Sequence, residues 1–132
     1  MNDLDDKPID KDSFAYQNLV GLDSWFAFTP VFTALTVVGA TSYSGRWRRI
    51  GRLVQFEVQF SAATSVESTA GTTYMALPVA PAKGLAGMAV MTNSTAKTAV
   101  GVCHIDVANT RVYPPSQVAS GNVFTMFGEY EV

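Results

Sequence analysis

The stretch that decides the fold covers residues 43–60 and reads YSGRWRRIGRLVQFEVQF. Its second half alternates strictly between apolar and polar residues, which is the pattern of a β-strand with one buried face and one face in water. Its first half carries four arginines around a tryptophan. Gly51 separates the halves, as a β-bulge or a close backbone approach would. The stretch predicts one long strand, or two with a kink at Gly51, with a buried face made of Val54, Phe56, Val58 and Phe60.

The composition favours a single domain. At 132 residues the chain is long enough to bury one core and too short for two domains. Charged residues make up only 15% and the formal net charge is -2, which argues against nucleic-acid binding because such proteins present a basic surface. The single cysteine, Cys103, excludes an internal disulfide and a cysteine-only metal site within one chain.

The N-terminal region is acidic, and it lacks the hydrophobic segment of a secretory signal. More than half of the eleven acidic residues fall within residues 1–23. The longest apolar run, residues 25–38, is too short to span a bilayer and contains Pro30. We therefore expect that the protein is made in the cytoplasm and does not insert into a membrane. The expected organisation is an acidic anchoring arm at residues 1–23 followed by a β-sandwich domain at residues 24–132.

About eight strands are predicted, because short alternating segments recur between clusters of turn residues. One of them is a strand of about six residues after Pro30. This spacing is typical of an antiparallel sandwich, so the predicted fold is all-β, a jelly-roll-like β-sandwich with an extended N-terminal arm. Recognition in such a fold usually occurs on surface loops. The predicted loops lie at residues 64–71, 83–87 and 113–121.

Candidate catalytic and metal-binding residues are sparse. His104 is the only histidine, and Asp106 shares its strand face, but two groups are too few for most metal sites. Copies of His104 around a three-fold axis would form a metal or pH-sensitive cluster, although a surface histidine is the simpler interpretation. Cys103 and His104 point to opposite faces of a strand and cannot form a nucleophile–base pair. We predict no catalytic residues, no metal, no cofactor and no enzymatic activity.

The arginine-rich segment has three interpretations. The arginines form a solvated face with Trp47 turned inward, they pair across a subunit interface with acidic residues of a neighbouring arm, or they bind a sugar together with aromatic side chains. We favour the interface. Its predicted residues are Arg46, Trp47, Arg48, Arg49, Arg52, Phe14, Tyr16 and Leu19. The aromatic candidates for a receptor or glycan contact are Trp25, Trp47, Tyr43, Tyr130 and, above all, Tyr113.

Several short motifs combine into a recognisable pattern. An FTP sequence at residues 28–30 and LT at 35–36 precede YSGRWRRIGRLV at 43–54, which has the form Tyr-x-Gly-x-aromatic-x-Arg-x-Gly. The later LP at 77–78 and GEYE at 128–131 complete it. Over about residues 25–132 this pattern resembles the small β-sandwich virion proteins of tailed bacteriophages, which are tail-fibre, receptor-binding and head-or-tail appendage domains.

The resemblance implies a non-enzymatic virion structural protein that forms a homotrimer. Its expected role is that of a tail-fibre or spike-type appendage in host adsorption, with a host surface glycan as a candidate ligand. The N-terminal arm would attach it to other virion proteins, either of the tail or baseplate or the major capsid protein. The alternative is a capsid decoration (cement) protein that stabilises the head. A third hypothesis is a free carbohydrate-binding module or a glycan-active enzyme.

Overall fold

The computed structural model describes most of the chain, and the description covers residues 24–62, 64–81, 87–119 and 121–132. The predicted anchoring arm, with Phe14, Tyr16 and Leu19, lies outside the described residues, as does most of the predicted loop at 83–87. All regular secondary structure in the described ranges is β-strand, so the all-β prediction is confirmed. No helix that is long and apolar enough to cross a membrane occurs among these residues.

Twelve strands form in the described part of the chain, where the sequence predicted about eight. They build a nine-stranded sheet with the order β1-β4-β5-β12-β8-β9-β10-β7-β2 and a three-stranded sheet with the order β11-β6-β3, and all pairings are antiparallel. The bounds are β1 Phe26–Phe28, β2 Phe32–Thr33, β3 Thr36–Val38, β4 Thr41–Ile50, β5 Leu53–Ala62, β6 Ser65–Ser68, β7 Tyr74–Ala76, β8 Gly87–Asn93, β9 Thr98–Asp106, β10 Arg111–Tyr113, β11 Gln117–Ala119 and β12 Val123–Glu131.

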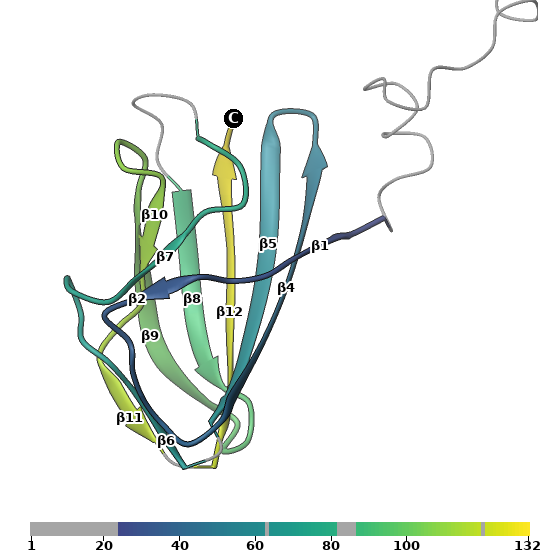
Figure 1. The fold of residues 1–132 in the computed structure, drawn as a ribbon. Helices are drawn as coiled ribbons and strands as arrows, with labels where there is room; N and C mark the ends of the chain where they lie inside the picture. The colour runs from purple at the N-terminus through teal and green to yellow at the C-terminus, as the bar shows by residue number, and fades with distance from the viewer. Residues whose placement is uncertain (1–23, 63, 82–86, 120) are drawn as a thin grey trace, which may run out of the picture.

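The large sheet is curled, so that strands from its two ends approach each other. Strands β4, β5, β12, β8 and β9 lie side by side, and the segment from β1 to β2 crosses in front of the sheet (Figure 1). The Phe32 ring on β2 lies 5.3 Å from the Phe60 ring on β5 and 5.8 Å from the Tyr43 ring on β4. Side-chain packing, and not a hydrogen-bonded ladder, therefore closes the sheet across its concave face.

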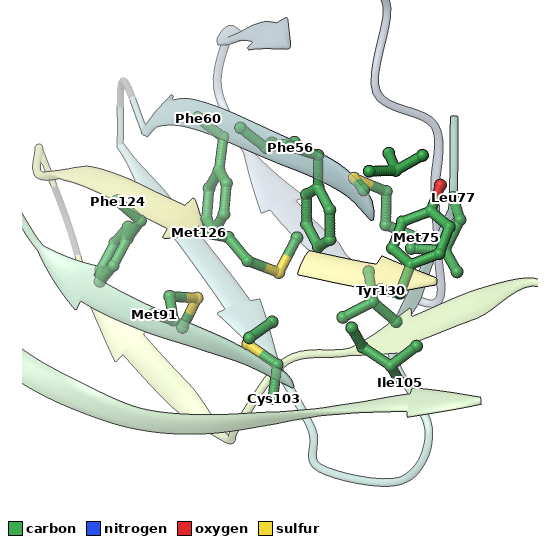
Figure 2. Packing of buried hydrophobic residues seen from close by; sticks show 14 of the residues in the cluster. Phe56, Phe60, Met75, Leu77, Met91, Cys103, Ile105, Phe124, Met126 and Tyr130 are labelled. Atoms are coloured by element: carbon green, nitrogen blue, oxygen red, sulfur yellow. The ribbon is translucent and has the colours of Figure 1, made fainter. Parts of the chain in front are cut away.

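The core fills the space inside the curl. Alternation places Val54, Phe56, Val58 and Phe60 of β5 inward, and all four are buried as the sequence predicted. The last strand contributes its own inward set, and the rings of Phe60 and Phe124 stack with centroids 5.3 Å apart. Figure 2 shows how these side chains interdigitate with those of β7, β8 and β9. Each fully buried side chain of this size contributes about 1.5–3 kcal/mol relative to its exposed state.

Gly51 forms a hairpin turn, which corrects the predicted bulge or kink. Ile50 ends β4 and Leu53 begins β5, and these residues are register partners, so only Gly51 and Arg52 connect the strands. The φ angle of Gly51 is 60°, in the left-handed region that glycine adopts without a clash of Cβ. The arginine-rich half and the alternating half are consequently neighbouring antiparallel strands. The second form of the prediction is correct in having two strands, but a hairpin turn joins them where a kink was predicted.

Three further predictions about loops and strands were wrong. The strand expected after Pro30 divides into β2 and β3, because Ala34 between them has a φ angle of 58°, which no strand accommodates. The loop predicted at residues 64–71 contains β6, and the loop predicted at 113–121 contains β11. These two strands pair with each other across the chain. Such long-range pairing gives strand structure to small polar residues whose local propensity indicates a loop.

Candidate functional site

The outer face of the large sheet, opposite the core, is the candidate functional surface. Because side chains alternate along each strand, the residues between the buried positions of β4, β5, β12, β8 and β9 point away from the core. The strand register aligns them into rows across the sheet. One row changes from charged to apolar along its length, and it reads Arg46, Glu57, Phe127, Val90 and Val102.

A charged region covers the β4 side of this face. Arg46 Nη2 lies 2.9 Å from Glu57 Oε2, which makes a salt bridge between neighbouring strands. In the adjacent row, Arg48 Nε donates to Gln55 Oε1 at 2.8 Å. The guanidinium carbons of Arg46 and Arg48 lie 4.4 Å and 4.5 Å from the ring centre of Trp25. Trp25 therefore makes cation–π contacts with both arginines on the outer surface.

The predicted interface residues of the arginine-rich segment separate onto two faces. Arg46 and Arg48 lie on the outer face, whereas Trp47 is half-buried on the inner face, with its ring 5.1 Å from Phe26. Arg49 Nε donates to the carbonyl oxygen of Gly51 at 2.8 Å. Arg52 is exposed in the hairpin turn. The structure thus brings together two of these five residues, and the role of the segment in an interface stays a prediction.

An apolar patch continues the outer face across β12, β8 and β9. It consists of Met88, Val90, Val102 and Phe127, which are 63%, 41%, 70% and 42% exposed. Phe127 is the register partner of Val90, and Val90 is the partner of Val102, so the side chains are neighbours. Single exposed apolar residues are common on proteins, but a contiguous group of large ones marks an interaction surface.

The sequence analysis missed this apolar patch. Residues 87–91 are apolar on both faces, so alternation alone does not indicate which side is buried. A usable signal did exist in β12, where Phe127 falls on the same face as Glu129 and Glu131. An aromatic residue in such a polar row predicts an exposed apolar side chain on the outer face.

A groove that we call the tyrosine groove lies where β9 meets β10. Tyr113 pairs with His104 across these strands, and their rings are 6.2 Å apart. On the other side of Tyr113, the ring of Tyr74 is 5.6 Å away. The groove has a volume of about 400 Å³, and its lining residues are Ala70, Gly71, Val102, His104, Asp106, Tyr113, Pro114 and Pro115. Of the predicted aromatic contacts, Tyr113 alone lines it, whereas Tyr130 is buried in the core.

Two charged residues flank the aromatic row. The side-chain amide of Asn109 donates to Asp106 Oδ2 at 2.8 Å and the Asn109 backbone N–H to Oδ1 at 3.2 Å, and these bonds lower the pKa of Asp106. The guanidinium carbon of Arg111 lies 4.0 Å from the centre of the Tyr74 ring. A hydrogen bond with Tyr113 raises the pKa of Arg111. Both groups are therefore charged at neutral pH. The positive charge of Arg111 offsets the negative charge of Asp106.

Cys103 is buried and points away from His104, as the alternation predicted, and burial raises the pKa of its thiol to about 12. Within the described ranges, no group of three or more His, Cys, Asp or Glu side chains is arranged to hold a metal ion. No family model, curated protein or solved structure matches this chain.

Proposed function

We propose that this chain is a non-enzymatic structural subunit of a bacteriophage virion, a homotrimeric tail-fibre or spike-type appendage that acts in host adsorption. The observation that carries the proposal is the apolar patch, whose four large side chains are exposed in a single copy of the chain. Such a surface is normally buried against another protein. Association of three copies would cover it, and the acidic arm at residues 1–23 would attach the trimer to the virion.

The motifs that resemble phage virion proteins belong to one connected unit. β1 pairs with β4 so that Phe28 lies opposite Gly45. A Cβ atom at Gly45 would lie 2.8 Å from Cε1 of Phe28 and 3.0 Å from Cγ of Pro30, so the FTP segment fills the space that this glycine leaves. The FTP and YSGRW segments thus depend on each other structurally. This dependence supports their interpretation as one motif of an appendage domain.

We also infer a two-layer, jelly-roll-like sandwich for the folded subunit. The central strands of the large sheet would form one layer. The strands β10, β7 and β2 together with the three-stranded sheet would form the other. The contact between Phe32 on β2 and Phe60 on β5 supports this arrangement, since it spans the core from one side to the other.

Antibody labelling of purified phage particles tests the proposal, with label position read by electron microscopy. An adsorption appendage predicts label at the tail or baseplate, and antibody against the outer face would also inhibit adsorption to host cells. Label on the capsid would replace the adsorption role with capsid decoration. Purified particles that carry no label, although they react with antibody against a known virion protein, would contradict both roles.

A further inference from the structure

We propose that the tyrosine groove binds a neutral saccharide. The inference deepens the adsorption role, on which its biological setting rests, but the binding is a property of the folded chain alone. Tyr113 is the central residue, and its ring lies between those of His104 and Tyr74. The sugar would occupy the groove beside Tyr113, between the β9 side chains and the loop at Ala70 and Gly71.

The aromatic row provides a stacking surface for a sugar ring. Pyranose rings present a face of C–H groups, which packs on the π-face of an aromatic side chain, whereas their hydroxyl groups point to the sides. Tyr113 is half-buried between two other rings, so little conformational entropy is lost when a ligand packs against it. Pro115 extends the apolar floor of the groove beyond the ring.

Polar groups at the edge of the groove suit hydroxyl ligands. Asp106 is ionised and its two oxygens offer about four acceptor sites, of which the donors of Asn109 use two. The remaining acceptor sites can receive hydrogen bonds from sugar hydroxyls. Arg111 is the register partner of Asp106 and offsets its charge, so the groove carries no net charge that would attract an acidic sugar. These two effects together select a neutral saccharide.

The rim of the groove is already held in place without a ligand. The backbone N–H of Ala70 donates to Ser116 Oγ at 2.7 Å, and the Ser68 hydroxyl donates to the Pro115 carbonyl at 2.7 Å. At the base of the same loop, the buried Thr73 hydroxyl donates to the Ala34 carbonyl at 2.7 Å. Two of these hydrogen bonds fix the short loop against the proline segment and the third fixes its base against Ala34, so binding requires little rearrangement, which favours affinity.

The test is a titration of the ¹⁵N-labelled full chain, followed by amide chemical shifts. The probes are maltotriose, cellotriose and chitotriose as neutral sugars, sialyllactose as an acidic sugar, and a proline-rich decapeptide. We expect at least one neutral trisaccharide to shift the amides of Val102, His104 and Tyr113 with a millimolar Kd. Tyr113→Ala should weaken that binding about tenfold or more, as loss of a stacked ring does.

Two further variants keep the test decisive if Tyr113→Ala fails to fold. His104→Ala removes an exposed ring and should weaken binding, whereas Phe26→Ala removes an exposed ring outside the groove and should leave binding unchanged. The proposal is overturned if no neutral trisaccharide shifts these amides, if sialyllactose binds more tightly, or if the peptide alone occupies the groove. Because this test needs no virion, its failure is distinct from a failure of the antibody labelling.

Discussion

The inner and outer faces of the central strands share one backbone but differ in what covers them. On β12 the inward residues Phe124, Met126 and Tyr130 are at most 1% exposed, whereas Phe127 between them is 42% exposed. Within one chain, β5, β8 and the strands across the core cover the inner face. Among the described residues, none covers the apolar part of the outer face in this way. The same alternation therefore encodes the core on one side and, on the other, the exposed surfaces that we propose for binding.

The largest expected change in the free energy of unfolding comes from a comparison of two phenylalanines, one on each face. Phe56 is fully buried on the inner face, so Phe56→Ala should lower the free energy of unfolding by about 3–5 kcal/mol. Phe127→Ala on the outer face should change the stability of the dissociated chain by only about 0.5 kcal/mol. Urea denaturation at low protein concentration measures both. Equal losses for the two variants would remove the distinction between the faces.

A smaller loss of stability is expected when one carbon atom is added to the closely packed inner face. A Cβ on Gly128 would lie 2.6 Å from Ala89 Cβ and 2.6 Å from Phe56 Cζ. Gly128→Ala should therefore overpack the core and lower the free energy of unfolding by about 1–3 kcal/mol. Thr92→Ala, at an exposed position of the neighbouring strand, serves as the control and should be nearly neutral. A neutral Gly128→Ala would show that the strands pack more loosely than described.

The pH dependence of stability tests the burial of two ionisable groups on the inner face, the Cys103 thiol and the Tyr130 hydroxyl. Burial raises the pKa of Cys103 from 9.0 to about 12 and that of Tyr130 from 10.0 to about 12. Since the unfolded chain ionises these groups first, their contribution to stability is complete below pH 9 and is lost progressively as the pH rises towards 12. Urea denaturation from pH 8 to 11 should show this decline. Cys103→Ala should delay its onset by about one pH unit, and a flat wild-type profile would contradict the account.

The smallest expected effect belongs to the charged region of the outer face. The exposed salt bridge between Arg46 and Glu57 should contribute about 0.2–1 kcal/mol, because solvent screens the pair and both side chains lose entropy. A double-mutant cycle with Arg46→Ala and Glu57→Ala measures the coupling, which should decrease in 1 M NaCl. A coupling above about 2 kcal/mol would place this region among the elements that determine the fold.

The sequence predicted the fold class and the buried face because both depend on local alternation. The inward residues of β5 and β12, and the opposite orientations of Cys103 and His104, all follow from a period of two. The strands β6 and β11 could not be predicted from local alternation, since they form through pairing between distant segments. The tyrosine groove also depends on pairing between distant segments. Tyr113 was identified as a candidate, but Tyr74 comes beside it only through the pairing of β7 with β10.

The mass of the assembled chain tests most directly whether the apolar patch is an interface. Sedimentation velocity of the full chain at micromolar concentration should give three times the 14.2 kDa of one chain. Val102→Asp places a charge at the most exposed patch residue and should give a monomer with an unchanged circular dichroism spectrum. A wild-type chain that sediments as a monomer, or a Val102→Asp variant that remains trimeric, would contradict the central claim.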